Sequence, residues 1–296
     1  MATPQERKFA FSYVERGKQF VAAKHYPDAL EALREATRRD PEIVEAWILL
    51  ALTHYRLSEY GECLGAADEA LKYDSANGDA WNYRGLALLR LGRPGEAFVQ
   101  FIHGANLYQS DPAFALNAGS ALHDLRRYDL ALIWSERALT LPSRYWPDPY
   151  WKAANSSAID LIYLGRFEEA ATQLASVAAV ATDQSKFWAT TGLLHIHWDQ
   201  YDDALIAIKR AIELDPNDPS GWERMAELLV ALEDYAKALG VATHGLELRP
   251  YSRELLEQKA KALRGLGRES EAEEIERAAQ ARLAEQLALL DQIGGL

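Results

Sequence analysis

The sequence predicts an all-α solenoid of about eight helix pairs, closed at its C-terminal end by a long capping helix. The main observation is an internal period of 34 residues that runs through residues 10–286. The repeats begin at Ala10, Val44, Gly78 and Pro112 and, after five additional residues, at Trp151, Ser185, Pro219 and Arg253. Because one such unit cannot bury its own apolar stripe, successive units are expected to stack and share a continuous core.

Small side chains recur at three places of the repeat. The eighth place holds Gly17, Ala51, Gly85, Gly119, Ala158, Gly192, Ala226 and Ala260; the twentieth holds Ala29, Cys63, Ala97, Ala131, Ala170, Ala204, Ala238 and Ala272. The twenty-seventh holds Ala36, Ala70, Gly104, Ala138, Ala211, Gly245 and Ala279, and only Val177 is larger than alanine there. Small residues at fixed places indicate that two helix backbones approach closely, since a bulky side chain would hold the axes apart. Each repeat is therefore predicted to be a pair of packed helices.

The ends of the predicted helices carry their own signals. An aromatic residue marks the start of the second helix in six repeats, as Tyr26, Tyr60, Tyr128, Phe167, Tyr201 and Tyr235. Gly92 and Gly165 lie where the first helix ends and suit a left-handed cap. Asp40 and Asp215, each followed by a proline, are expected to act as N-caps between repeats.

These features together resemble the tetratricopeptide repeat family, whose 34-residue unit holds a helix A and a helix B. The likeness extends over residues 10–286. The chain departs from the family pattern at the seventh place, where six repeats lack the leucine, and at the thirty-second, where proline remains only as Pro41, Pro216 and Pro250. The resemblance implies a right-handed superhelix whose concave surface is lined mainly by helix A.

The predicted organisation is one continuous solenoid. Residues 1–9 form an N-terminal extension, 10–145 repeats 1 to 4, 146–150 an insertion, 151–286 repeats 5 to 8, and 287–296 the end of the capping helix with a tail. Asp148 and Pro149 are expected to start helix A of repeat 5 early. Two roles stay open for Trp146 and Tyr150: they plug an irregular stacking interface, or they remain exposed and anchor a partner.

The last helix carries a predicted capping box of Ser270 and Glu273 and extends beyond the usual length. It either covers the end of the array with a solvated surface, or it forms a homodimer contact. The residues assigned to that contact are Leu287, Leu289, Leu290 and Ile293.

The charge balance and the single cysteine disfavour several classes of partner and site. Lys and Arg number 32 against 44 Asp and Glu, a net charge of −12, and the chain has no dense basic run, which disfavours nucleic acid as a partner. The single cysteine, Cys63, allows neither an internal disulfide nor a cysteine zinc site. The sequence shows no apolar core of signal-peptide length and no membrane span. We expect a cytoplasmic protein that does not enter membranes.

Catalytic motifs are absent from the sequence. There is no glycine-rich phosphate loop, nucleophile elbow or His-Glu-x-x-His motif. His195 and His197 are two residues apart on a helix, so their side chains diverge and cannot share a metal ion. Cys63 takes a place that alanine holds in the other repeats, and a buried thiol there is expected to be inert. The prediction is a non-enzyme without cofactor or metal.

The predicted groove lies on helix A of repeats 3 to 6. A water-facing helix is normally rich in Lys and Glu, yet this face carries Asn, Ser, Thr, His and Tyr beside Leu and Ile, a combination that suits an extended peptide. Repeats 7 and 8 are mostly charged at the same places. The alternative is ordinary polar lining, or a groove filled by the chain itself. The candidate peptide-binding residues are Asn82, Tyr83, Leu86, Asn117, Ser120, His123, Lys152, Asn155, Ser156, Ile159, Tyr163, Lys186, Thr190 and His197.

The functional hypothesis is a scaffold or adaptor that binds an extended segment of another protein. No three consecutive repeats carry the full Lys, Asn and Arg clamp by which chaperone-binding members of the family hold a carboxyl tail, so that mode is not expected. Two alternatives stay open. The chain is a regulatory subunit whose superhelix changes pitch on binding a peptide or small ligand and so controls an enzyme or transcription factor, or it is a self-assembling homo-oligomeric scaffold.

Overall fold

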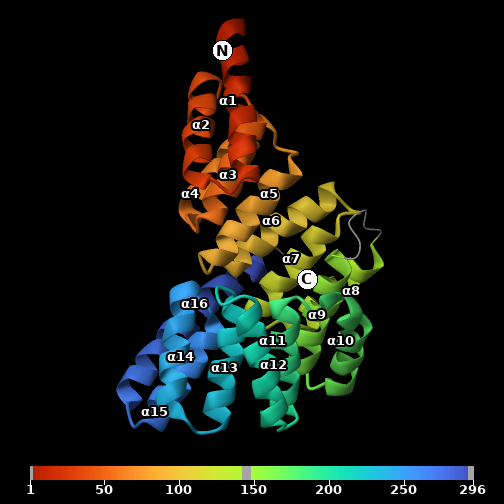
Figure 1. The fold of residues 1–296 in the computed structure, drawn as a ribbon, viewed down its shortest axis with the longest axis vertical. Coiled ribbons are helices and arrows are strands. Elements are labelled where there is room, and N and C mark those ends of the chain that lie inside the picture. Colours follow the sequence, from red (N-terminus) through yellow and green to blue (C-terminus); the bar gives the residue numbers. More distant parts are fainter. Residues whose placement is uncertain (1–2, 142–147, 293–296) are drawn as a thin grey trace. The chain divides into compact units, whose positions relative to one another are not determined.

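Sixteen α-helices follow one another in the computed structural model, which describes residues 3–141 and 148–292, and those residues contain no β-strand. For residues 148, 149, 291 and 292 the description is limited to the backbone. The predicted all-α repeat solenoid is confirmed. The chain divides into two compact units, residues 1–109 and residues 110–296, coloured red to orange and yellow through green to blue in Figure 1.

The first unit contains repeats 1 to 3. Its helices are α1 (Pro4–Ala22), α2 (Tyr26–Arg39), α3 (Val44–Arg56), α4 (Tyr60–Tyr73), α5 (Gly78–Arg90) and α6 (Pro94–Leu107). Each helix packs on its partner in the repeat, and α2 on α3 and α4 on α5 join one repeat to the next. A capping box starts α1, because Glu6 N donates to Thr3 Oγ1 at 3.2 Å and Thr3 N donates to Glu6 Oε2 at 2.8 Å. Most of the predicted N-terminal extension therefore lengthens the first helix.

The second unit contains repeats 4 to 8. Its helices are α7 (Pro112–Asp124), α8 (Tyr128–Thr140), α9 (Asp148–Tyr163), α10 (Phe167–Ala181), α11 (Ser185–His197), α12 (Tyr201–Leu214), α13 (Pro219–Ala231), α14 (Tyr235–Leu248), α15 (Arg253–Gly265) and α16 (Glu269–Gln292). Helix α9 packs on both α7 and α8, so repeats 4 and 5 stack directly although the insertion lies between them in sequence. The boundary between the units falls before repeat 4, not at the insertion.

The small residues lie where helices meet. All eight residues of the twentieth place, including Cys63, have no exposed surface. A Cβ added at Gly85 would lie 2.4 Å from Phe101 Cε1, and one added at Gly192 would lie 2.5 Å from Ile208 Cγ1. Such distances leave no room for a methyl group, which explains why the repeat holds only glycine or alanine at its eighth place. The prediction of closely packed helix pairs is confirmed.

Every repeat makes the same left-handed turn between its two helices. The backbone angle φ is +70° at Gly92 and +74° at Gly165, as predicted for a glycine cap. The equivalent residue is also left-handed in the other six repeats, at Lys24, Ser58, Arg126, Asp199, Glu233 and Gly267. Five repeats therefore adopt this strained conformation without glycine, so the turn is imposed by the packing of the helix pair and not by local sequence alone.

Three predicted caps were wrong. Asp40 and Asp215 end α2 and α12, and their Oδ1 atoms accept hydrogen bonds from the backbone N of the residue two positions later, at 3.2 and 3.0 Å. An aspartate followed by proline suits this Asx turn as well as a cap, and the helix N-cap comes three residues later, as at Asp218. Ser270 lies inside α16, which begins at Glu269 because the tight turn fixes its start as in the other repeats.

The insertion is described only in part, and Trp146 lies outside the described residues. Helix α9 begins at Asp148, in agreement with the expected early start. Tyr150 is half-buried and packs against a core cluster that includes the buried Trp151, Leu161 and Phe187. This packing suits the structural role for Tyr150, whereas an anchoring role stays a prediction.

The C-terminal helix α16 is long, as predicted, and runs from Glu269 to Gln292. Of the residues assigned to a dimer contact, Leu290 is buried within the single chain, Leu287 and Leu289 are half-buried, and Ile293 lies outside the described residues. Less apolar surface than expected is therefore free for a second copy. A homodimer through this helix stays a prediction.

Candidate functional site

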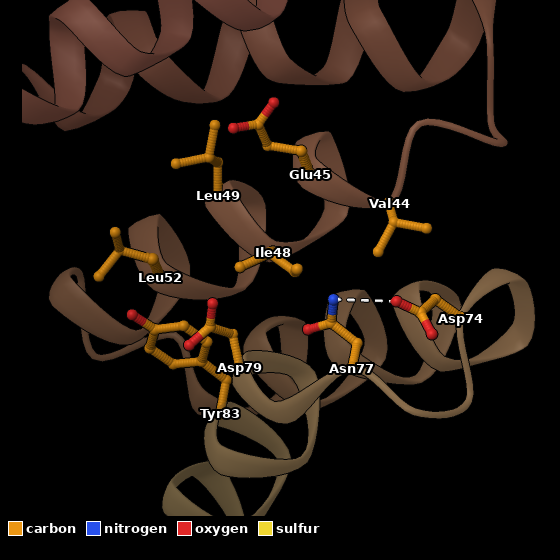
Figure 2. Close-up of a pocket in the computed structure, with 9 residues that line it drawn as sticks. All are labelled: Val44, Glu45, Ile48, Leu49, Leu52, Asp74, Asn77, Asp79 and Tyr83. Atoms are coloured by element: carbon orange, nitrogen blue, oxygen red, sulfur yellow. Dashed lines mark hydrogen bonds between the residues drawn. The ribbon is translucent and has the colours of Figure 1, made fainter. Parts of the chain in front are cut away.

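A hollow of about 540 Å³ lies in the first unit, between helix A of repeat 2 and helix A of repeat 3. Helix α3 supplies Val44, Glu45, Ile48, Leu49 and Leu52, the turn before α5 supplies Asp74 and Asn77, and α5 supplies Asp79 and Tyr83 (Figure 2). Its volume is in the range of sites that hold small molecules or short peptide segments. The hollow combines an apolar wall with a row of polar groups, which is the usual composition of a binding site.

Spacing along the helices explains why these residues converge. Val44, Ile48 and Leu52 are four residues apart, so they form one stripe along α3. Asp79 and Tyr83 are also four apart on α5. Figure 2 shows the Tyr83 ring and the Asp79 carboxylate together, beneath Leu52 and Ile48. All three apolar residues of the stripe are half-buried, so their side chains are available to a ligand.

The turn at the end of the hollow is fixed by side-chain hydrogen bonds. Asn77 caps α5, with its Oδ1 accepting from Ala80 N at 3.1 Å. Its amide nitrogen donates to Asp74 Oδ2 at 3.2 Å (Figure 2). Asp74 Oδ1 in turn accepts from Ala76 N at 3.1 Å. The polar end of the hollow is therefore held in place before any ligand arrives.

The hollow is acidic. Its lining includes the carboxylates of Glu45, Asp74 and Asp79 and no lysine or arginine. Lys18 on α1 pairs with Glu45 at 2.8 Å, but it also pairs with Glu15 at 2.7 Å. Burial, followed by the nearby Asp79 carboxylate, raises the pKa of Tyr83 to about 12, so its phenol is neutral at physiological pH.

The predicted groove residues of repeat 3 lie at or near this hollow. Tyr83 lines it, whereas Asn82 and Leu86 are half-buried on the same helix and do not line it. The hollow itself was not predicted: the predicted groove lies on repeats 3 to 6, whereas the hollow is built mainly by repeat 2. The stripe of Val44, Ile48 and Leu52 was the available signal.

In the second unit, His123 faces side chains of its own chain. Its Nδ1 lies 2.7 Å from Asp160 Oδ1 and its Nε2 lies 3.8 Å from Glu254 Oε1. Burial disfavours the charged imidazole, but the hydrogen bond with Asp160 and the carboxylates of Glu254 and Asp124 outweigh it and raise the pKa of His123. Residues of repeats 4, 5 and 8 thus meet in one cluster.

Tyr163 belongs to the same buried face. Its ring stacks on Tyr128, with ring centroids 4.8 Å apart, and burial raises the pKa of its hydroxyl. The hydroxyl accepts a hydrogen bond from Arg224 Nη1 at 2.9 Å, and the same nitrogen pairs with Glu227 Oε2 at 2.8 Å. These bonds link repeats 5 and 7. Peptide binding by His123 and Tyr163 stays a prediction, since both are already engaged within the chain.

Ion pairs also join the first and last repeats of this unit. Arg249, just after α14, donates from Nη2 to both carboxylate oxygens of Asp124 at the end of α7, at 3.1 and 2.9 Å. Its Nη1 lies 3.6 Å from Glu223 Oε1. Arg126 pairs with Glu257 of α15. We call these five residues the closing ion pairs, because they connect repeat 4 with repeats 7 and 8.

The other predicted groove residues of the second unit are scattered in environment. Lys152, Lys186 and His197 are exposed, Asn117, Ser120, Ser156 and Ile159 are half-buried, and Asn155 and Thr190 are buried. Ser120 and Thr190 donate to the backbone carbonyls of Leu116 and Lys186 at 3.1 and 2.9 Å. The Oδ1 atom of Asn155 is buried without a hydrogen-bond partner among the described residues. These residues therefore do not form one uniform polar stripe.

His195, His197 and Cys63, the residues considered as metal ligands or nucleophile, contact other side chains or are buried within the chain. His195 is half-buried with its Nδ1 2.7 Å from Gln200 Oε1, and His197 stacks on Phe167. Cys63 is fully buried, and burial raises the pKa of its thiol to about 12, so the inert role predicted for it fits. Across residues 3–141 and 148–292, no three His, Cys, Asp or Glu side chains are grouped to hold a metal ion, and no helix is long and apolar enough to cross a membrane.

A family model described as tetratricopeptide repeat matches residues 14–62, 58–105 and 156–219, more than half of the chain. The chain belongs to the tetratricopeptide repeat family. Two of the matches lie in the first unit, across α3, α5 and the hollow, and the third covers repeats 5 and 6. Tetratricopeptide repeat proteins generally bind other proteins, and their fold is typically a non-catalytic scaffold.

The chain is similar to individual known proteins over different lengths. Cilia- and flagella-associated protein 70 of Macaca fascicularis is 29% identical over 103 residues, which are 35% of this chain and 10% of that protein. The chain thus spans about a tenth of that curated relative's length. The Pseudomonas aeruginosa pilF structure has a TM-score of 0.57 at 20% identity, covering 75% of this chain and 99% of that one. The structure of the APC/C hetero-tetramer Cut9–Hcn1 has a TM-score of 0.59 at 14% identity, covering 91% of this chain and 53% of that one.

Proposed function

We propose that this protein is a non-enzymatic adaptor that binds an extended segment of another protein in the hollow between α3 and α5. The observation that carries the proposal is the half-buried stripe of Val44, Ile48 and Leu52 facing Tyr83 across a hollow of about 540 Å³. A stripe with this spacing can receive alternate side chains of an extended peptide. The phenol of Tyr83 and the carboxylate of Asp79 offer hydrogen bonds to the same segment.

The composition of the hollow argues against recognition of a carboxyl tail by a chaperone-type clamp. A clamp needs Lys or Arg to hold the terminal carboxylate, whereas Glu45, Asp74 and Asp79 contribute only negative charge. A cytoplasmic location is part of the proposal, because Cys63 is a free thiol, as is usual in a reducing compartment.

Substitution of the apolar wall tests the binding site. In affinity purification with quantitative mass spectrometry, Ile48→Glu should lose the partners that the wild-type protein retains. Ile206→Glu is the matched control, because the Ile206 side chain is 67% exposed on α12 and its replacement should leave partner recovery unchanged. Circular dichroism must show both variants folded. Equal recovery of the same partners by wild type and a folded Ile48→Glu variant would refute this site.

The same purification decides between the hollow and the predicted groove of repeats 3 to 6. Asn117→Ala combined with Asn155→Ala removes two of the amides that were expected to pair with a peptide main chain. If this double variant loses partners while Ile48→Glu retains them, the second unit holds the site. The opposite pattern supports the hollow.

A regulatory role is a second candidate, and the closing ion pairs favour it. They join repeat 4 to repeats 7 and 8 by contacts between residues 125 or more positions apart, so the second unit has a discrete connection that a ligand could break. Spin labels on α7 and α15 would report the distance between repeats 4 and 8 by electron resonance. A distance that lengthens when a captured partner is added supports regulation, and an unchanged distance supports a rigid adaptor.

A further inference from the structure

The charges in the hollow are not all available to a ligand. Glu45 is paired with Lys18, and Asp74 accepts hydrogen bonds from Ala76 N and the Asn77 amide. Asp79 is exposed in the first turn of α5, and no side chain of the described residues is paired with its carboxylate. The strongest free charge of the hollow is therefore a single carboxylate at its edge.

The surroundings of Asp79 define what group suits it. Asp79 lies one helical turn before Tyr83, whose phenol is kept neutral and can accept or donate a hydrogen bond. Leu52 and Ile48 lie above this pair (Figure 2). Arg56 also acts on Tyr83 and lowers the pKa of its hydroxyl, but Arg56 does not line the hollow. A ligand therefore meets an apolar surface that leads to an unpaired carboxylate.

Lysine and arginine match such an arrangement better than other side chains do. Both bury an aliphatic stem along apolar surface while the charged head remains at a polar edge. A stem on Leu52 and Ile48 would carry the head group to Asp79 and the Tyr83 hydroxyl. An acidic segment would instead place like charges beside Asp79, Asp74 and Glu45, which costs binding energy.

We propose that the segment bound in the hollow is cationic, with a Lys or Arg side chain crossing Leu52 and Ile48 to pair with Asp79. This inference rests on the proposed function, that the hollow binds a segment of another protein. The partner is a basic, partly apolar region of a different protein, and not a second copy, because this chain carries 44 acidic against 32 basic residues. The net charge of −12 also favours the encounter with a basic partner.

Selection from a random peptide library tests the charge. Peptides retained by the full wild-type chain should be enriched in Lys and Arg relative to the input. The enrichment should fall with Asp79→Asn and persist with Asp202→Asn, a matched exposed aspartate in the first turn of α12. A selected Lys-containing peptide should bind Asp79→Asn about five-fold more weakly than wild type in fluorescence polarisation, because an exposed ion pair contributes at most about 1 kcal/mol.

The outcomes separate this inference from the proposed function. Peptides that are selected by wild type and lost with Ile48→Glu, but are neutral or acidic, would overturn the cationic ligand and keep the binding site. Retention of the Lys and Arg enrichment in Asp79→Asn would likewise overturn the role of that carboxylate. If wild type selects no more peptides than Ile48→Glu does, both the inference and the proposed site fail.

Discussion

Replacing Arg249 with alanine should loosen the second unit selectively. The guanidinium holds both carboxylate oxygens of Asp124 at 2.9 and 3.1 Å and approaches Glu223 at 3.6 Å. Without it, Asp124 retains no cation at ion-pair distance among the described residues. Glu223, which is 5% exposed, retains the Ser252 hydroxyl at 2.7 Å and Arg224 at 3.8 Å. The variant therefore leaves the Asp124 carboxylate unpaired, and Glu223 with fewer partners, at the contact between repeats 4 and 7.

The free energy lost in Arg249→Ala depends on how deeply the Arg249–Asp124 ion pair is buried. Removing one member of a fully buried ion pair costs about 3 to 5 kcal/mol, mainly because the other charge is left unpaired. The side chains of Arg249 and Asp124 are 26% and 20% exposed, so water recovers part of that energy. We expect a loss of about 2 kcal/mol, which corresponds to about 30-fold in the local opening equilibrium. Asp124→Ala should be non-additive with Arg249→Ala by about 1 to 2 kcal/mol, since both remove the same contact.

Hydrogen exchange with mass spectrometry measures this effect locally. Amides of α7 and α15 should exchange faster in Arg249→Ala, whereas those of α1 to α4 in the first unit should be unchanged. Arg268→Ala is the matched control, because it removes an arginine paired to the exposed Glu271 at 2.7 Å and should change nothing measurable. If Arg249→Ala behaves like this control, or if the effects of Arg249→Ala and Asp124→Ala simply add, the ion pair does not hold repeats 4 and 7 together.

Gly85→Ala should lower the free energy of unfolding by about 1 to 3 kcal/mol in urea denaturation, because its Cβ would lie 2.4 Å from Phe101 Cε1; unchanged stability would contradict the close approach of α5 and α6. A Cβ added by Gly165→Ala would meet no atom within 4 Å, so we expect the free energy of unfolding to fall by about 1 kcal/mol, solely because alanine disfavours the φ of +74°. A higher melting temperature than that of wild type would refute this cause. The pKa of His123 is raised in the folded protein, so its charged imidazole stabilises the folded state. That contribution is complete below the ordinary pKa of 6.5 and is lost as the pH rises through the higher folded pKa. His123→Gln should remove that part of the pH dependence of unfolding, and identical slopes for both proteins would count against the contact with Asp160.

The repeat pattern predicted the helix pairs because their contacts are local. Gly85 and Phe101 are 16 residues apart, and the same spacing separates Gly192 from Ile208. The same contact therefore recurs along the sequence, and the repetition makes it recognisable. The left-handed turn was predicted only where glycine marks it. At Lys24 and Glu233 the same conformation occurs without a sequence signal, because stacking of the two helices forces it on whatever residue is present.

The closing ion pairs of the second unit were harder to predict, because they depend on contacts between distant repeats. Arg249 meets Asp124 across 125 positions, and this distance in sequence is closed only by the accumulated rotation of successive repeats. A small error in each rotation would separate the two residues completely. The sequence shows only that these places of repeats 7 and 8 are mostly charged, and it does not reveal that Glu223 and Arg224 are buried.

The two units use charge in opposite ways, and the contrast explains why we assign binding to the first. In the second unit the carboxylates that face inward find cations within the chain: Asp124 has Arg249 of another repeat, and Glu227 has Arg224 on its own helix. A face whose charges are compensated internally gains nothing from a charged ligand and must lose ion pairs to admit one. In the hollow of the first unit, Asp79 has no such partner among the described residues, so a ligand cation adds an interaction without removing one. Binding is therefore less costly in the first unit, even though the second contains more of the polar residues that resemble a peptide groove.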